Sequence, residues 1–182
     1  MSDIKFTYLK QPPSKFTFDM PKLKRWVEDR CEGKVLNLFA GKTMLGIDEL
    51  RNDICIDMPA HYHLEVEEFI KMAVEKGLKF DTVILDPPYN SRKSREKYEG
   101  RYIGSFTKIK DILPQIITEN GLVITFGYDT VGMSKSRGFE KIEICIICHN
   151  GDYQDTLGVM ERRISNNLQT AEKSSKFKRF FK

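Results

Sequence analysis

Short apolar runs alternate with helical periodicities along most of the chain. Residues 35–39 and 80–85 are nearly continuous apolar runs, which are typical of strands buried on both faces. Between them, apolar residues recur at helical spacing over residues 66–77. Because strands that alternate with helices favour a parallel sheet, the pattern predicts an α/β fold.

The stretch between these two strands is compressed. We expect a short helix over residues 44–50, a second strand over 52–57 that ends in Asp57, and a brief third strand over 61–64. Only 28 residues separate Asp57 from Asp86, fewer than a complete strand–helix–strand–helix passage needs. We therefore expect the helix between the second and third strands to be missing or reduced to a turn.

The second half of the chain predicts a kinked helix, a strand and a hairpin. Helical spacing over residues 106–117 indicates a helix that Pro114 kinks and that ends at Asn120-Gly121, before a fifth strand over 122–126. Two further strand-like runs, 139–148 and 153–160, flank Asn150-Gly151, which is a strong hairpin signal. The expected fold is α/β, a mostly parallel, doubly wound sheet that ends in an antiparallel hairpin.

The first 30 residues predict an N-terminal arm and a helix. Residues 1–19 are irregular, although Phe16 and Phe18 alternate with polar neighbours as in a short strand or an extended arm. Asp19 is the expected N-cap of a helix that begins near Pro21.

Composition narrows the class of protein. The chain has 182 residues, of which 40% are hydrophobic and 31% charged, so it can bury a core. It has neither an apolar run of about 18–20 residues nor the apolar region of a signal peptide, and its four cysteines are scattered. We expect one cytoplasmic domain over residues 1–164, no membrane partner, and a basic tail over 165–182.

The positive charge is focused on two segments. Residues 91–104 carry a net charge of +3 and residues 172–182 carry +4, which leaves −3 for the rest of a chain whose total is +4. A polyanion such as a nucleic acid would be steered toward these segments. The candidate nucleic-acid-binding residues in the first segment are Arg92, Lys93, Arg95, Lys97 and Arg101.

A metal site is not expected. Cys145 and Cys148 form a C-x-x-C pair, but in a strand a separation of three places the two sulfur atoms on opposite faces. No second cysteine pair is present to complete four ligands.

The most informative residues follow the strand at 80–85, where the chain reads Asp86-Pro87-Pro88-Tyr89. Two prolines remove backbone donors, so the carbonyl groups of this turn act only as acceptors. Acceptors beside an aromatic ring suit a flat ring that bears an exocyclic amine. This turn resembles motif IV of the amino-group methyltransferases, which use S-adenosyl-L-methionine to methylate exocyclic nitrogens in nucleic acids.

Residues 34–46 resemble motif I of the same family. They form a strand and a tight turn at Gly41, at the edge where open parallel sheets bind ligands. The resemblance implies a Rossmann-like, class I methyltransferase fold. Gly41-Lys42-Thr43 does not complete a phosphate-binding loop, because Leu36 stands where that signature needs a glycine.

The resemblance also implies roles for single residues. The family has an acid where Asn37 stands, and the Asn37 carbonyl oxygen is expected to accept from the cofactor's ammonium group. Asp57 corresponds to the acid that binds the ribose of the cofactor, and Glu65 to an acid near its adenine or to a helix cap. Phe16 or Phe18 could cover the bound cofactor, although packing in the core is the expected role of each. The implied cofactor-binding residues are Asn37, Phe39, Ala40, Gly41, Thr43, Asp57 and Glu65, and the implied catalytic residues are Asp86, Pro87, Pro88 and Tyr89.

The chain most resembles small, single-domain DNA adenine methylases. Adenine N6 in DNA is therefore the favoured target, while adenine N6 or guanine N2 in RNA stays open. A non-catalytic binding module on the same fold, and methylation of a protein glutamine or a small molecule, are the other classes. Because no target-recognition domain is evident, a protein partner or second subunit could supply target recognition.

Overall fold

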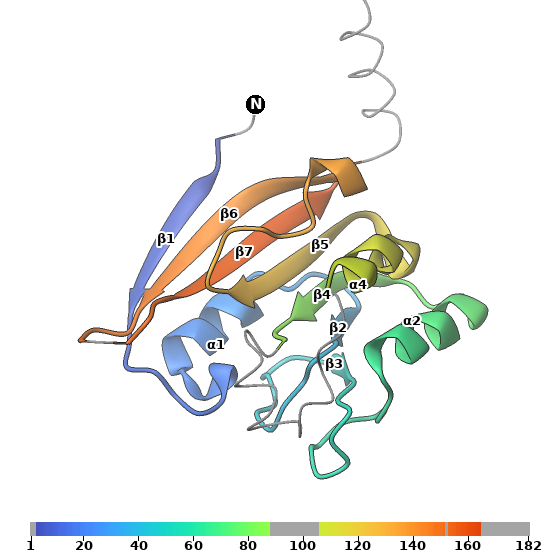
Figure 1. The fold of residues 1–182 in the computed structure, drawn as a ribbon, viewed down its shortest axis with the longest axis horizontal. Helices are drawn as coiled ribbons and strands as arrows, with labels where there is room; N and C mark the ends of the chain where they lie inside the picture. The colour runs from blue at the N-terminus through green and yellow to red at the C-terminus, as the bar shows by residue number, and fades with distance from the viewer. Residues whose placement is uncertain (1–2, 88–105, 152, 165–182) are drawn as a thin grey trace, which may run out of the picture.

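The computed structural model describes residues 3–87, 106–151 and 153–164, which form one mixed sheet with helices on both faces (Figure 1). The strand order is β1-β6-β7-β5-β4-β2-β3. The strands are β1 (Lys5–Lys10), β2 (Val35–Asn37), β3 (Glu49–Arg51), β4 (Phe80–Leu85), β5 (Ile117–Gly127), β6 (Phe139–Cys148) and β7 (Thr156–Arg163). The α-helices are α1 (Pro21–Glu28), α2 (Val66–Glu75) and α4 (Phe106–Ile112), and the 3₁₀ helices are η1 (Thr17–Asp19), η2 (Leu113–Ile116) and η3 (Lys135–Arg137).

Four of the six neighbouring strand pairs are parallel, and β7 lies antiparallel between β5 and β6. The expected α/β sheet with an antiparallel hairpin is therefore confirmed. At the hairpin turn, Asn150 and Gly151 have φ of 64° and 60°, the left-handed backbone that such turns require.

Two hydrophobic cores lie on opposite faces of the sheet. On one face, α1 packs Trp26 against Phe126 of β5, with ring centroids 6.4 Å apart. On the other face, α2, α4 and η2 cover the half of the sheet that contains β2, β4 and β5. Strand β4 is buried by both layers, which explains why residues 80–85 are mostly apolar.

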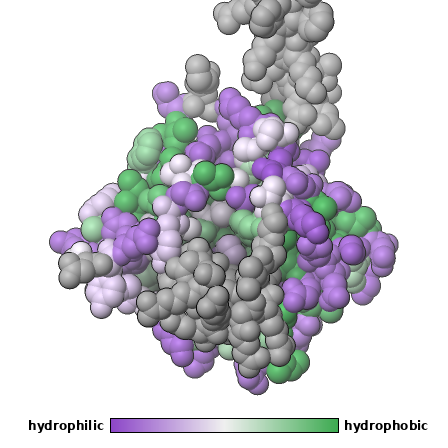
Figure 2. Space-filling model, viewed as in Figure 1, coloured by the Kyte–Doolittle hydropathy of each residue, from purple (hydrophilic) through white to green (hydrophobic). Residues whose placement is uncertain are grey.

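Strand β1 forms one edge of the sheet and is less well covered. Its Phe6 and Tyr8 side chains are 67% and 62% exposed. They point away from α1, and no helix that the structure describes covers β1 on their side of the sheet. In Figure 2, hydrophobic atoms lie among hydrophilic ones at the upper left of the molecule, in the region where Figure 1 places β1.

Residues 41–60 differ from the sequence prediction. The helix predicted over 44–50 is wrong, since the chain runs as an irregular loop into the short strand β3. The second strand predicted over 52–57 is also wrong, because β3 ends at Arg51 and the chain then turns. No helix lies between β3 and α2, as expected.

Buried charges explain the irregular path. The Glu49 carboxylate accepts the Leu45 N–H at 3.0 Å and pairs with Arg51. The expected third strand is reduced to an isolated bridge between Asn52 and Tyr62. Side-chain hydrogen bonds thus replace the backbone ladder that the sequence pattern predicted.

Smaller corrections concern element boundaries. The expected irregular arm contains strand β1, and the N-cap of α1 is Met20 instead of Asp19. Strand β5 begins before Asn120, which lies at a register shift with φ of 63° and so does not end the helix. The kink at Pro114 is confirmed as the change from α4 to η2. None of the helices that the structure describes is long and apolar enough to cross a membrane.

Candidate active site

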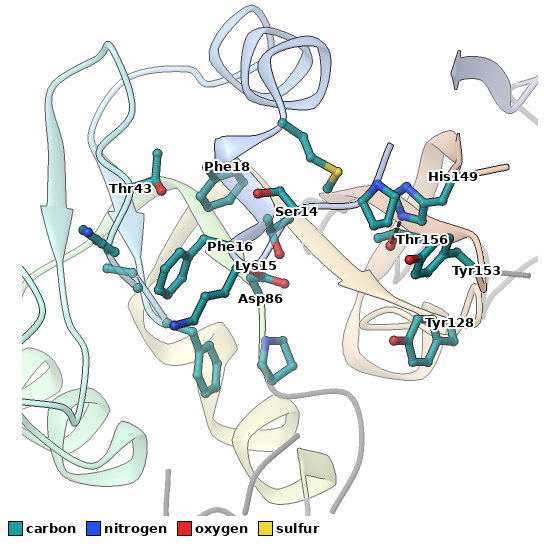
Figure 3. A pocket seen from close by; sticks show the side chains of 18 of the residues that line it. Ser14, Lys15, Phe16, Phe18, Thr43, Asp86, Tyr128, His149, Tyr153 and Thr156 are labelled. Atoms are coloured by element: carbon teal, nitrogen blue, oxygen red, sulfur yellow. Dashed lines mark hydrogen bonds between the residues drawn. The ribbon is translucent and has the colours of Figure 1, made fainter. Parts of the chain in front are cut away.

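A cavity of about 290 Å³ opens at the carboxyl ends of β2, β4 and β5. Three walls form it: the segment between β1 and α1, the loop after β2, and the residues that follow β5 and β6. Figure 3 shows Asp86 between Phe16 and Thr43 on one side and Tyr128, His149 and Tyr153 on the other. The cavity therefore lies where an open α/β sheet binds its ligands.

Asp86 and Pro87 line the cavity directly after β4. The Leu38 N–H donates to the Ile84 carbonyl oxygen at 3.1 Å, which keeps the exit of β2 beside the exit of β4. The segment that resembles motif IV and the segment that resembles motif I thus line the same cavity. Pro88 and Tyr89 lie outside the described residues.

The loop after β2 places Phe39, Ala40, Gly41 and Thr43 on the cavity wall. Gly41 has φ of 58°, a left-handed backbone that favours glycine, and its backbone lies near the segment between β1 and α1. A Cβ atom added at Gly41 would lie 3.9 Å from the Phe16 ring.

Two buried charged side chains, those of Asp53 and Arg51, form hydrogen bonds with the backbone of this loop. The Gly41 N–H donates to Asp53 Oδ2 at 2.8 Å. Arg51, which is 1% exposed, donates from Nη2 to the carbonyl oxygens of Ala40 at 3.1 Å and Gly41 at 2.9 Å. The backbone of the loop is thus positioned before any ligand binds.

Asn37 does not line the cavity. It is fully buried, and its Nδ2 donates to Glu49 Oε2 at 2.9 Å. Its Oδ1 is buried without a hydrogen-bond partner. The structure therefore places Asn37 in the Glu49–Arg51 network beneath the loop and not among the lining residues.

The two predicted acids Asp57 and Glu65 are also not among the lining residues. Asp57 is exposed in the turn after β3, so its predicted position at a strand end is wrong. Asp53 lies two residues after the end of β3 and is 2% exposed, and the sequence prediction did not select it. Glu65 is the N-cap residue of α2 and makes no side-chain capping hydrogen bond.

The arm between β1 and α1 closes the cavity. Phe16 and Phe18 both line it, and Thr43 Oγ1 donates to Asp19 Oδ1, which joins the arm to the loop after β2. Gln11 anchors the start of the arm, because its N–H donates to the Cys148 carbonyl oxygen at 3.0 Å.

The third wall was missed by sequence analysis. It contains Tyr128 after β5 and, from the β6–β7 hairpin, His149, Tyr153 and Thr156. His149 Nδ1 lies 2.9 Å from the Gln11 carbonyl oxygen, which can only accept, so Nδ1 carries a hydrogen; Nε2 lies 2.9 Å from Thr156 Oγ1. The sequence signal that could have identified Tyr128 and His149 is that each directly follows the end of a strand.

The described lining residues carry charges of both signs. Asp86 contributes a carboxylate, and Lys15 and Lys42 contribute ammonium groups. Among the described ranges, no group of three or more His, Cys, Asp or Glu residues could hold a metal ion. The predicted nucleic-acid-binding residues Arg92, Lys93, Arg95, Lys97 and Arg101 and the tail 165–182 lie outside the described ranges.

No protein-family model and no curated protein matches the chain. Several solved structures do share its fold. A candidate S-adenosylmethionine-dependent methyltransferase from Streptococcus mutans superposes with a TM-score of 0.54 at 17% identity, over 78% of this chain and 48% of its own. A candidate methyltransferase in complex with S-adenosylhomocysteine gives 0.53 at 18%, over 71% and 44%. A hypothetical protein from Thermus thermophilus gives 0.52 at 14%, over 82% and 90%.

The chain thus spans about half the length of the first two of these proteins. At these identities the likeness concerns the fold alone. The chain has the Rossmann-like fold of the S-adenosylmethionine-dependent methyltransferases, as the sequence predicted.

Proposed function

We propose that the chain transfers a methyl group from S-adenosyl-L-methionine to an exocyclic amino group of a nucleic-acid base, with adenine N6 in DNA as the first candidate. The observation that carries the proposal is the placement of Asp86 and the Gly41 loop on one cavity. The resemblance of residues 86–89 to motif IV and the shared methyltransferase fold support it.

The residues of the cavity fit the cofactor. Its volume of about 290 Å³ is close to the lower end of ligand pockets, at about 300 Å³. Phe16 and Phe39 supply aromatic surface, the backbone at Gly41 leaves room for close approach, and the Lys42 ammonium can pair with a carboxylate. When bound, S-adenosyl-L-methionine supplies an electrophilic methyl group on a positively charged sulfur.

Asp86 would act on the acceptor amine. The amino nitrogen of adenine is a weak nucleophile because its lone pair is delocalised into the ring. The Asp86 carboxylate, which begins the turn after β4, can accept an N–H hydrogen bond and so hold the lone pair toward the donor. Pro87 presents no N–H to compete. Positioning and directed charge then provide most of the rate enhancement.

The charges around the cavity favour a polyanion. Lys15 and Lys42 line the same cavity as Asp86, and the sequence adds a net charge of +3 over residues 91–104, directly after the motif. These cations have no evident use for a neutral peptide glutamine. A nucleic acid is therefore the substrate class that we propose.

The direct test identifies the methylated product. The full chain is incubated with methyl-labelled S-adenosyl-L-methionine and unmethylated DNA or RNA, which is then digested to nucleosides for mass spectrometry. We expect label in N6-methyldeoxyadenosine. N2-methylguanosine or N6-methyladenosine from RNA would move the assignment to RNA. No label in any nucleoside would contradict the proposal and would indicate a non-catalytic module or a methyl acceptor other than a nucleic acid.

The matched variants are Asp86→Ala and Asp48→Ala. Asp48 is exposed and is not among the described lining residues. We expect Asp86→Ala to abolish transfer while cofactor affinity is largely kept, and Asp48→Ala to leave both unchanged. An Asp86→Ala variant that keeps most of its rate would contradict the proposed role of Asp86.

A further inference from the structure

The exposed side chains of β1 are aromatic and lie on one face of the sheet. Phe6 and Tyr8 are 67% and 62% exposed, and residues two apart on a strand point the same way, about 6.6 Å apart. The partners of Phe6 and Tyr8 on β6 are Ile144 and Ile146, and those on β7 are Val159 and Leu157.

Along one such row the exposure rises toward the edge. Val159 is 1% exposed, Ile144 is 8% exposed and Phe6 is 67% exposed. The helical layer that covers the centre of this face ends before β1. Large aromatic side chains are therefore exposed to solvent on this edge strand. An edge strand with a structural role alone would need only smaller or polar residues at these positions.

This aromatic surface continues toward the cavity. Tyr8 pairs with Ile146, two residues before Cys148 at the carboxyl end of β6, and a hydrogen bond with the Cys148 side chain raises the pKa of the Tyr8 hydroxyl. The β6–β7 hairpin follows there and carries Tyr153, which is 66% exposed and also lines the cavity. Phe6, Tyr8 and Tyr153 thus lead from the sheet edge to the place where the proposed reaction occurs.

A cationic side chain lies on the same face as the aromatic ones. Lys10 ends β1 on the face of Phe6 and Tyr8, and Lys22 Nζ donates to the Lys10 carbonyl oxygen at 3.1 Å, whereas Lys5 lies on the opposite face, 3.8 Å from Glu143. Of the carboxylates near β1, Glu143 accepts from Thr7 and Arg30 on the opposite face, and Asp155 accepts the His149 N–H at 3.1 Å. Lysines beside exposed aromatic rings are the combination with which sheets bind single-stranded nucleic acids, stacking two or three bases on their aromatic side chains.

We propose that Phe6, Tyr8 and Tyr153 form a stacking surface for the bases of a single-stranded nucleic acid that neighbour the reacting nucleotide. This inference rests on the proposed function for the identity of the reacting nucleotide. It adds a substrate class, because bases paired in a duplex could not lie on this surface.

The test measures binding without turnover. The full chain is titrated into fluorescein-labelled single-stranded DNA and RNA of about 12 nucleotides, within the range of single-strand site sizes. We expect Phe6→Ser/Tyr8→Ser to weaken binding by about 10- to 100-fold, since each lost base stack weakens binding by a substantial factor. The matched control is Ile56→Ser, which removes a side chain that is 73% exposed in the turn after β3, at the opposite edge of the sheet.

Two outcomes would overturn the inference. One is an affinity of Phe6→Ser/Tyr8→Ser equal to that of the wild type, or no binding by the wild type. The other is a dimer, detected by light scattering, that the double variant separates without a change in affinity, which would make β1 an interface between copies. Circular dichroism and S-adenosylhomocysteine affinity verify that each variant is folded. Because binding is measured directly, loss of the stacking surface and absence of methyl transfer are separate results.

Discussion

The backbone N–H of Gly41 lies 2.8 Å from the Asp53 carboxylate, so the cavity loop is fastened to the end of β3 by a buried acid. The other Asp53 oxygen accepts the Cys55 N–H at 2.9 Å. Asp53 therefore determines the position of the loop backbone without itself being among the residues that line the cavity.

Asp53→Ala should weaken cofactor binding by about tenfold or more and lower the free energy of unfolding by about 1–3 kcal/mol, because two backbone donors lose their partner. Asp57→Ala, at an exposed position, should change neither quantity. Calorimetric titration with S-adenosylhomocysteine and urea unfolding measure the two effects. A larger loss of affinity for Asp57→Ala than for Asp53→Ala would restore Asp57 as the ribose ligand.

Asn37→Asp should destabilise the chain by about 2 kcal/mol or more, because it places a second carboxylate beside Glu49 and only Arg51 is present to compensate. The double variant Asn37→Asp/Glu49→Gln should recover most of this loss. Urea unfolding of the two variants tests the coupling. If Asn37→Asp instead strengthened cofactor binding without loss of stability, residue 37 would contact the ligand.

Glu143→Gln should remove a pH-dependent part of the stability. Burial alone would raise the pKa of Glu143, but hydrogen bonds from Arg30, Thr7 and Trp26 outweigh it and lower the pKa to about 2 from 4.5. The folded state therefore gains stability above pH 4.5, and this gain is lost as the pH falls toward 2.

From this lowered pKa, Glu143 should contribute about 3 kcal/mol to the free energy of unfolding at neutral pH. Urea unfolding between neutral and acidic pH should show a steep decline for the wild type and a shallower one for Glu143→Gln. Glu75→Gln, at an exposed position on α2, is the control and should follow the wild type. Parallel curves for all three proteins would contradict the role of Glu143.

Gly33→Ala should cost more stability than Gly77→Ala, although both glycines have similar φ values of 56° and 63°. A Cβ atom at Gly33 would lie 2.2 Å from Asp81 Oδ2, while a Cβ atom at Gly77 would meet nothing within 4 Å. Gly77→Ala should cost about 1–2 kcal/mol from backbone strain.

Gly33→Ala should lower the free energy of unfolding by about 1–2 kcal/mol more than Gly77→Ala does. The Asp81 carboxylate must move, and it would lose the Lys34 N–H at 2.8 Å and the Thr118 hydroxyl at 2.9 Å. Thermal or urea unfolding compares the two variants. Equal losses of stability for the two variants would mean that the Asp81 side chain can move aside and keep its hydrogen bonds.

Sequence patterns predicted the parts of the fold that depend on apolar burial. Strand β4 and helix α2 were recognised because their side chains are buried at the periods of a strand and a helix. The path of residues 41–60 was not, because Glu49, Arg51 and Asp53 hold it by side-chain hydrogen bonds to distant backbone groups. A single sequence carries no periodic signal for such bonds.

The candidate site divides in the same way. Asp86 and Gly41 were predicted because they follow recognisable strands, and the structure brings both to the cavity. Tyr128 and Tyr153 were missed because only the pairing of β7 between β5 and β6 brings their segments to the same edge. Strand β1 was missed because its exposed aromatic residues resemble neither a buried strand nor a helix.

The pairing of β1 with β6 has a consequence for synthesis on the ribosome. Gln11, which begins the arm, bonds to His149, 138 positions further along the chain. Neither the first strand nor the arm can take its place until the last third of the polypeptide has emerged, and contacts at such separations form slowly. Nascent chains that end before β6 should be unable to retain ligand, so the pocket is the part of the molecule that matures last.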